Sequence, residues 1–281
     1  MQTIRQIDAL RDAVAALRAD GQPVAFVPTM GALHAGHIAL VEEARRRTPH
    51  VVASIFVNPR QFAAHEDLDR YPRRLAKDQA MLAEAGCQLL WAPEVDTMYP
   101  AGFATAITIG GVTAPLEGAA RPGHFDGVAT VVAKLFNQVG PDIALFGEKD
   151  YQQLAVIRRL VADLDFPIEI IGVPTEREED GVALSSRNAY LTEEERAQAR
   201  ALPRALGEAA GSIAAGGDIA EALARAEAAL VRAGFGPIDY IALADAATLA
   251  PLDRLDRPAR LLAAAWLGTT RLIDNIAVMP G

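Results

Sequence analysis

The sequence predicts an α/β protein: a parallel β-sheet flanked by helices, followed by a smaller α+β domain. Two observations predict this fold. Between residues 4 and 174, short apolar runs alternate with segments whose apolar residues recur every three or four positions. These short runs are apolar throughout, which is typical of parallel strands that helices cover on both faces. Such a sheet is Rossmann-like, and a chain of 281 residues has room for a second domain.

The first predicted element is a helix, because apolar residues three and four positions apart run from Ile4 to Leu17 and stop at Gly21. In parallel sheets, ligands bind beyond the carboxyl ends of the strands, near a change in strand order. We therefore expect the chemistry in the loops that follow the strands. The further helices are expected over 38–47, 75–85, 128–136 and 151–164, and the strands over 24–27, 51–57, 88–92, 143–146 and 168–173.

The pattern changes after Pro174, so we predict two domains, 1–174 and 175–281. Thr192 followed by Glu195 is a capping box, which predicts the start of an alanine-rich helix. The later apolar runs have the spacing of antiparallel strands. In the second domain we expect helices over 193–214 and 219–233, and strands over 238–243, 260–266 and 271–278.

The composition excludes several classes of protein. The chain has 27 Lys and Arg against 36 Asp and Glu, a net charge of −9, which argues against a nucleic-acid partner. The single Cys87 excludes a disulfide within the chain, and we expect a buried thiol at a strand edge. No apolar stretch reaches the ~18 residues of a membrane span, and the N-terminus does not read as a signal peptide. We expect a cytoplasmic protein with no membrane partner.

Lysine is rare in this chain. The only lysines are Lys77, Lys134 and Lys149, and the other 24 basic residues are arginines. Codon bias explains such a ratio without any function. Lys149 nevertheless lies between Glu148 and Asp150 at a predicted strand end, where a cation can meet an anionic ligand. The alternative for this triplet is a solvated turn with paired charges.

The first predicted strand leads into two histidines, His34 and His37, where a helix begins. One helical turn would bring both imidazoles to the same face. Gly36 between them lets a ligand approach the backbone, and the N–H groups of a helix N-terminus suit a phosphate. The alternatives are zinc ligation, for which a third ligand is missing, or two unrelated polar histidines.

Three other segments carry polar residues suited to a site. Gln61 follows the second predicted strand, and its amide can fix a small polar substrate, although Asn58–Pro59 beside it also fits a simple turn. Ser185, Ser186 and Arg187 form a loop that can wrap a polyphosphate. The long loop 116–128 is either functional, structural or a contact with a partner subunit. The glycine signatures of dinucleotide-binding proteins and of P-loops are absent.

The H-x-G-H pattern after the first strand resembles the nucleotidyltransferase and class I aminoacyl-tRNA synthetase superfamily, and the loop 184–187 resembles its mobile K-M-S-K-S loop. Five motifs together resemble the pantoate–β-alanine ligase family and span residues 28–192, with looser matches at 264–268 and 271–275. The motifs are PTMGALHAGH, SIFVNPRQF, LEGAARPGHFDGVATVV, FGEKDYQQL and DGVALSSRNAYLT.

This resemblance implies a two-step reaction in coenzyme A biosynthesis. The carboxylate of (R)-pantoate attacks the α-phosphorus of ATP to give pantoyl adenylate and diphosphate. The amine of β-alanine then displaces AMP and forms pantothenate. The substrates supply the nucleophiles, so the protein has to align them, stabilise phosphate charge and exclude water. The family also implies a homodimer in the cytoplasm.

The resemblance also implies roles for individual residues. The expected catalytic residues are His34, His37, Lys149 and Arg187, with His37 the proton donor in the family's usual description; we favour electrostatic stabilisation. Gln61 and Gln153 would bind pantoate, and Gln61 also β-alanine. The loop 184–187 would close over the triphosphate as a lid. The expected ATP-binding residues are Met30, Gly31, Ala32, Leu33, His34, Ala35, Gly36, His37, Gly147, Glu148, Lys149, Asp150, Glu176, Leu184, Ser185, Ser186 and Arg187.

The chain departs from the family in one place. Some members carry an acidic cluster after the Arg-Tyr-Pro-Arg segment, associated with a metal, whereas here only Asp78 remains. We therefore expect Mg²⁺ to be carried by ATP. Lys77 reads as a surface residue, and the sequence assigns no role to Lys134. Two other functions are open: a nucleotidyltransferase that stops at an adenylated product, and a non-catalytic nucleotide-binding regulator.

Overall fold

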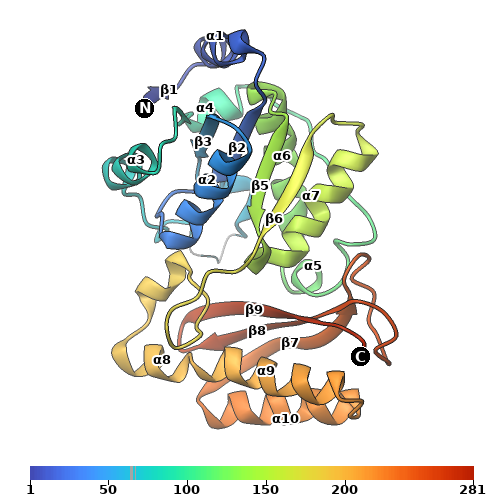
Figure 1. The fold of residues 1–281 in the computed structure, drawn as a ribbon. Coiled ribbons are helices and arrows are strands. Elements are labelled where there is room, and N and C mark those ends of the chain that lie inside the picture. The colour runs from blue at the N-terminus through green and yellow to red at the C-terminus, as the bar shows by residue number, and fades with distance from the viewer. Residues whose placement is uncertain (64–65, 67) are drawn as a thin grey trace. The chain divides into compact units, whose positions relative to one another are not determined.

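The computed structural model describes residues 1–63, 66 and 68–281 (Figure 1). The chain divides into two compact units. The main segment of the second unit begins at Thr175, and this unit also takes in two short segments that precede it. The first unit comprises Met1–Gly110, Arg121–Glu148 and Val156–Pro174, and the second comprises Gly111–Ala120, Lys149–Ala155 and Thr175–Gly281.

The first unit contains a six-stranded parallel sheet, which confirms the predicted Rossmann-like α/β fold. Its strand order is β1-β4-β3-β2-β5-β6, and each neighbouring pair is parallel. The two central strands are buried on both faces: consecutive side chains of a strand point to opposite sides, and nearly all of them are buried here, including the polar Thr29, His50 and Ser54. The strands are β1 (Gln2–Ile4), β2 (Val24–Thr29), β3 (His50–Ile55), β4 (Leu89–Trp91), β5 (Ile143–Gly147) and β6 (Glu169–Val173).

The prediction at the N-terminus was wrong for Ile4. The helical spacing begins only at Ile7, and Ile4 belongs to a short strand that pairs with Trp91 of β4. Three residues are too few for a periodic signal, so this edge strand forms through its neighbour. Cys87 is buried against the sheet, as predicted, and burial raises the pKa of its thiol to about 11.

Helices of the first unit cover the sheet. Helix α2 buries Leu40, Val41 and Ala44, and α3 buries Leu82, in a core shared with the strands. The predicted loop 116–128 is shorter than expected, because α5 and the start of α6 lie within it. The helices among residues 1–174 are α1 (Ile7–Leu17), α2 (Ala35–Arg47), α3 (Leu75–Glu84), α4 (Val95–Met98), α5 (Glu117–Ala120), α6 (His124–Val139) and α7 (Tyr151–Asp163), with short 3₁₀ turns η1 (Arg18–Asp20), η2 (Pro59–Gln61) and η3 (Glu148–Asp150).

The order of strands fixes where a ligand can enter the sheet of the first unit. From β2 the chain winds outward to β3 and β4, and it then returns to add β5 on the other side of β2. The carboxyl ends of β2 and β5 therefore flank the point at which the order reverses, where open α/β sheets bind ligands. Met30 follows β2 and Glu148 follows β5 at this edge.

The second unit combines an antiparallel sheet with helices, as predicted. Helices α9 and α10 bury Leu206 and Leu230 in one core with Leu261 of β8. Its strands are β7 (Phe235–Asp245), β8 (Ala259–Leu267) and β9 (Thr270–Val278), paired in the order β7-β8-β9. Its helices are α8 (Glu193–Gln198), α9 (Ala201–Ala214) and α10 (Ile219–Arg232), and η4 (Ser186–Tyr190) is a 3₁₀ turn.

The single helix predicted over 193–214 is two helices, α8 and α9. Pro203 accounts for the interruption, because a proline nitrogen cannot donate to the carbonyl of Ala199 and its ring crowds that turn. Pro203 is tolerated within the first turn of α9, where the N–H groups have no intrahelical partner. The capping box at Thr192 and Glu195 is present as predicted.

None of the helices that the structure describes combines the length and apolar character needed to cross a lipid bilayer.

Candidate active site

The structure brings His34 and His37 together at the start of α2. His34 is the N-cap residue, and the two ring centroids lie 4.1 Å apart. The backbone N–H of His34 donates a long hydrogen bond of 3.4 Å to Nδ1 of His37. When His37 is neutral, this arrangement puts its proton on Nε2, because Nδ1 acts as the acceptor. Both rings therefore belong to the N-terminus of a 13-residue helix, which favours anions.

The loop between β2 and α2 has an unusual backbone. Gly31 and Ala32 have φ values of 83° and 53°, in the left-handed region that alanine rarely adopts. The carboxylate of Asp78 accepts hydrogen bonds from the N–H groups of Ala32 at 2.9 Å and Leu33 at 3.0 Å. Asp78 is 1% exposed. The loop that carries the expected ATP-binding residues is thus held in place by hydrogen bonds to one buried side chain, that of Asp78.

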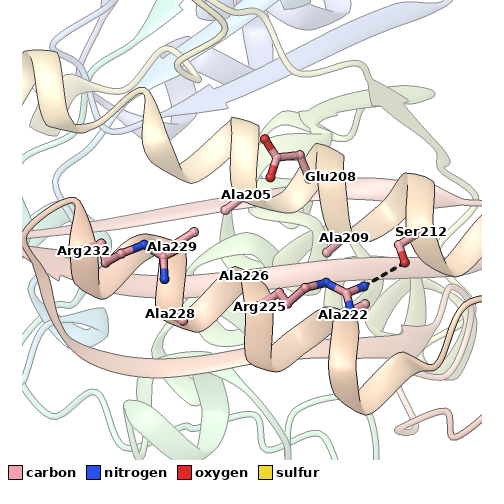
Figure 2. Close-up of a pocket in the computed structure, with 10 residues that line it drawn as sticks. All are labelled: Ala205, Glu208, Ala209, Ser212, Ala222, Arg225, Ala226, Ala228, Ala229 and Arg232. Atoms are coloured by element: carbon pink, nitrogen blue, oxygen red, sulfur yellow. Dashed lines mark hydrogen bonds between the residues drawn. The ribbon is translucent and has the colours of Figure 1, made fainter.

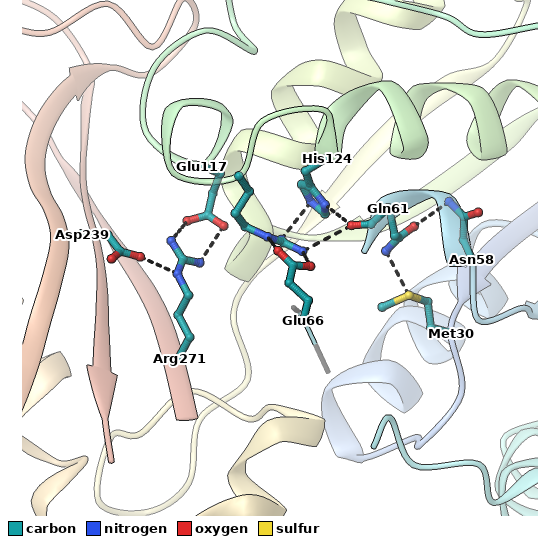
Figure 3. Close-up of polar contacts among 9 residues, drawn as sticks. Met30, Asn58, Gln61, Glu66, Glu117, His124, Asp239 and Arg271 are labelled. Atoms are coloured by element: carbon teal, nitrogen blue, oxygen red, sulfur yellow. Dashed lines mark hydrogen bonds and ion pairs between the residues drawn. The ribbon is translucent and has the colours of Figure 1, made fainter. Parts of the chain in front are cut away.

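Gln61 lies close to the same loop, with a relative exposure of 8%. Its Oε1 accepts a hydrogen bond from Nδ2 of Asn58 at 3.0 Å, and its Nε2 donates to Sδ of Met30 at 3.0 Å (Figure 3). Asn58 is itself oriented, since its Oδ1 accepts from the hydroxyl of Tyr99 at 2.8 Å. Among the residues that the structure describes, the donor group of Gln61 therefore meets only a weak sulfur acceptor, which a substrate oxygen can replace.

The segment with the sequence RPGHFDGV holds the backbone of Gln61. Nδ1 of His124 lies 2.8 Å from the Gln61 carbonyl oxygen, and Arg121 forms a 2.7 Å ion pair with Glu66. Burial is the largest single effect and raises the pKa of Glu66, but the hydrogen bond and charge of Arg121, with smaller contributions from His124 and a backbone hydrogen bond, together outweigh it and the pKa is lowered. A Cβ at Gly127 would collide with the backbone carbonyl of residue 60, so only glycine lets α6 approach so closely.

In the second unit, β9 holds the segment that carries Lys149. The side-chain amide of Asn275 donates to the carbonyl oxygen of Lys149 at 2.9 Å. Asn275 is 3% exposed, and its Oδ1 accepts from Arg260 at 3.1 Å. The Arg260 guanidinium lies 4.1 Å from the centre of the Tyr151 ring. The backbone at Lys149 is therefore anchored.

The residue before Asn275 holds another candidate segment. Asp274 forms a 2.7 Å ion pair with Arg177, with side-chain exposures of 1% and 28%. Next to Arg177, the carbonyl of Glu176 accepts from the N–H of Leu184 at 2.9 Å. The structure thus brings Glu176 and the loop 184–187 together, and in that loop Ser185 Oγ accepts from the N–H of Arg187 at 3.3 Å.

The two neighbouring glutamines of α7 differ. Gln152 is buried, and its amide accepts from the N–H of Glu117 at 2.9 Å and donates to the carbonyls of Val112 and Pro115. Gln153, the expected pantoate ligand, is only partly buried. Because these three hydrogen bonds of Gln152 hold residues 112–117 in place, that segment has a structural role.

Glu117 itself is the centre of a buried charge cluster in the second unit. Its carboxylate accepts two hydrogen bonds from Arg271, at 2.8 and 2.7 Å, and one from the Tyr240 hydroxyl at 2.7 Å. Arg271 also pairs with Asp239 at 2.6 Å (Figure 3). Burial lowers the pKa of Arg271, but the hydrogen bonds and charge of Glu117 outweigh this and the pKa is raised. This cluster fastens α5 to β7 and β9.

A groove of about 290 Å³ lies between α9 and α10 (Figure 2). Alanines such as Ala205, Ala226 and Ala229 line it, together with Arg225. The Arg225 guanidinium donates a hydrogen bond to the hydroxyl of Ser212. None of the residues expected to act on ATP or pantoate lies in it, so this groove is not the candidate site.

No group of three or more His, Cys, Asp or Glu side chains in the described part of the chain is arranged to hold a metal ion. Asp78 uses both oxygens on backbone N–H groups.

Several positioning residues were missed from the sequence. Asn58 was interpreted as a turn, and Asp78, Asn275 and Arg177 were given no role at the site. A signal existed for Asn275, which lies in the RLIDN segment matched to the family, but its partner is 126 residues away in the chain. Lys134, to which the sequence assigned no role, places its Nζ 4.8 Å from the ring centre of Phe103, a cation–π distance.

The fold and the histidine pair define a class of protein: an α/β protein whose H-x-G-H motif lies where the central strand β2 leads into helix α2. The chain belongs to the pantoate–β-alanine ligase family, whose model matches residues 2–277. The pantothenate synthetase of Rhizorhabdus wittichii is 70% identical over 280 residues, which cover 100% of this chain and 99% of that protein. The pantothenate synthetase of Sphingopyxis alaskensis is 62% identical over 278 residues, covering 99% of this chain and 100% of that protein.

Solved structures agree with this membership. The crystal structure of pantothenate synthetase from Thermus thermophilus has a TM-score of 0.94 and 54% identity, and the match covers 100% of both chains. The pantoate–β-alanine ligase from Francisella tularensis, complexed with β-γ ATP and β-alanine, has a TM-score of 0.83 and 34% identity, and the match covers 98% of this chain and 97% of that chain.

Proposed function

We propose that this chain condenses (R)-pantoate with β-alanine to form pantothenate, with ATP converted to AMP and diphosphate. Membership of the pantoate–β-alanine ligase family supports the overall reaction. The single observation in the site that carries it is the histidine pair at the N-terminus of α2, beyond the carboxyl end of the central strand. A helix N-terminus with two imidazoles suits the phosphates of ATP.

In the first step, the pantoate carboxylate attacks the α-phosphorus, diphosphate leaves and pantoyl adenylate forms. Lys149 and Arg187 provide cations, and His34 and His37 donate hydrogen bonds to the charge that develops on phosphate oxygens. The tautomer assigned to His37 supports this role, because a neutral ring already carries a proton on Nε2. Literal proton donation is not needed.

The ATP-binding set comprises Met30–His37, Gly147–Asp150, Glu176 and Leu184–Arg187. Met30–His37 contacts the phosphates at the start of α2. The second domain, which begins near residue 175, carries 184–187 as a lid that closes over the triphosphate and keeps water from the adenylate. Mg²⁺ arrives with ATP, because it prefers phosphate oxygens and water.

Gln61 and Gln153 bind pantoate in this proposal, and Gln61 also lies beside β-alanine. Support comes from the Nε2 group of Gln61, whose acceptor, the Met30 sulfur, is weak enough for a hydroxyl or carboxylate oxygen to displace. In the second step, the β-alanine amine attacks the acyl carbon, the acyl–phosphate bond breaks and AMP leaves. The relative from Francisella tularensis, with β-γ ATP and β-alanine bound, supports both substrate classes. A cytoplasmic homodimer completes the proposal.

An isotope experiment tests the adenylate route. Pantoate labelled with ¹⁸O in its carboxylate is incubated with ATP, Mg²⁺ and β-alanine, and AMP is examined by mass spectrometry. Attack by the carboxylate leaves one ¹⁸O atom in AMP and one in pantothenate. Unlabelled AMP would exclude pantoyl adenylate, and an adenylated product that persists with β-alanine present would instead favour a nucleotidyltransferase. The proposed homodimer is tested separately by mass photometry, which measures the molecular mass of the protein in solution.

A further inference from the structure

Asp78 lies in the first turn of α3 and is 1% exposed, yet it belongs to no acidic cluster in the described part of the chain. Its two carboxylate oxygens accept the consecutive N–H groups of Ala32 and Leu33. Charge-assisted hydrogen bonds and the helix N-terminus together compensate for burying the charge. The carboxylate is therefore matched to the loop backbone.

The backbone of the loop at Gly31 and Ala32 has the conformation and the space that this carboxylate requires. Ala32 has a φ of 53°, a conformation that costs energy for any residue with a Cβ. A Cβ at Gly31 would lie only 3.1 Å from Oδ2 of Asp78 and 3.1 Å from Ile55, so glycine leaves the carboxylate its space. The next residue after the two N–H donors is His34, the N-cap of α2.

We propose that Asp78 is a positioning residue: by binding the N–H groups of Ala32 and Leu33 it holds the left-handed turn at Gly31 and Ala32, which presents His34 and His37 to the nucleotide. This inference rests on the proposed function, since it gives the turn a purpose in binding ATP. The proposal also assigns Asp78 a role other than that of a metal ligand. A Mg²⁺ ion keeps several waters, and a carboxylate that is 1% exposed offers it no access without opening the loop.

The central experiment is Asp78→Asn, which keeps one oxygen but turns an NH₂ group toward a backbone N–H. We expect kcat/KM for ATP to fall about 10- to 100-fold, the scale of a small misplacement of catalytic groups. The concentration of Mg²⁺ that gives half-maximal activity, measured at saturating ATP, should be unchanged.

Ala32→Gly in the Asp78→Asn background provides the decisive comparison. Glycine adopts the left-handed conformation without a steric cost, so it should restore a large part of the lost kcat/KM if Asp78 acts through this turn. A metal ligand at residue 78 predicts no restoration and a shifted Mg²⁺ midpoint; that pair of results would overturn the proposal.

Asp245→Asn is the matched control. Asp245 is also buried and also accepts two backbone N–H groups, those of Ala247 and Thr248, in a turn outside the candidate site. Asp245→Asn should lower the melting temperature about as much as Asp78→Asn does and should leave KM for ATP unaltered. A change in KM for ATP as large as that of Asp78→Asn would reduce Asp78 to a general stabilising residue.

A second variant covers the case in which Asp78→Asn does not fold. Ala32→Val leaves the buried carboxylate in place but puts a branched side chain at a positive φ. It should also lower kcat/KM for ATP at least about 10-fold with an unchanged Mg²⁺ midpoint, and full activity would contradict the proposal. If the parent chain makes no pantothenate, the proposed function itself fails; an active parent with an unaffected Asp78→Asn rejects this inference alone.

Discussion

The two units hold their candidate residues by different means. In the first unit, the loop before His34 is fixed through its backbone N–H groups, by a carboxylate that is 1% exposed. In the second unit, an ion pair between Arg177 and Asp274 and one amide hydrogen bond from Asn275 hold the segments, and the Arg177 side chain is 28% exposed. The first arrangement fixes two consecutive peptide N–H groups, whereas the second holds the Arg177 side chain and the Lys149 carbonyl through side chains of β9. Such tethering suits the lid that we propose for 184–187.

Lys149→Ala should have the largest effect on activity. If Lys149 stabilises phosphate charge, adenylate formation falls about 100- to 1,000-fold, while the melting temperature stays unchanged. Release of diphosphate in the presence of pantoate measures the step. Lys77→Ala, at an exposed position of α3, is the control. Equal rates in Lys149→Ala and the parent would remove the second unit's main contribution to chemistry.

Arg177→Met breaks the tether of the second unit. It leaves the Asp274 carboxylate, which is 1% exposed, without its guanidinium, and we expect a loss of about 3 kcal/mol in the free energy of unfolding. Urea unfolding measures it. The same change in Arg159→Met, whose ion pair with Asp163 is exposed, should cost under about 1 kcal/mol. Similar losses in both variants would show that the Arg177 pair is no stronger than a surface contact.

Acid should weaken the second unit at Asp180, which lies between Arg177 and the loop 184–187 in the sequence. A hydrogen bond from Arg196 is the main cause that lowers the pKa of Asp180 from 3.8 to about 2. Because the folded pKa lies below the unfolded value, the contribution of Asp180 to stability is present above pH 3.8 and is lost as the pH falls through about 2. Urea unfolding between pH 5 and pH 2 should therefore show a shallower pH dependence in Asp180→Asn than in the parent. Parallel curves would argue against a pair that persists in solution.

The smallest effect concerns Cys87 in the first unit. Because burial raises the pKa of its thiol to about 11, little thiolate exists at pH 8 and reaction with a disulfide reagent should be slow until the protein unfolds. Arg177→Met should leave the labelling rate of folded protein unchanged, because Cys87 belongs to the core of the first unit. Faster labelling in that variant would show that the tether in the second unit also stabilises the first.

Much of the fold was predictable because its signals are local. Continuous apolar runs marked the central strands, and the capping box marked the start of α8. The strand at Ile4 was missed because three residues carry no period, and the break before α9 was missed although Pro203 was visible. At the site, the H-x-G-H spacing indicated the histidine pair, but Asp78 and Asn275 could not be assigned, because each binds backbone atoms of residues distant in the chain. Asn58 bonds the nearby Gln61, but Asn58–Pro59 fitted a simple turn equally well.

By itself, the sequence determined the α/β class, the family and the segments that carry chemistry, because periodicity and motif spacing are properties of neighbouring residues. The tertiary structure decided how those segments are held. Asp78 accepts the N–H groups of residues 45 and 46 positions away, and Asn275 reaches the carbonyl of a residue 126 positions away. Backbone N–H and C=O groups are the same in every residue type but proline, so no pattern of side chains reveals which of them a buried carboxylate or amide will bind.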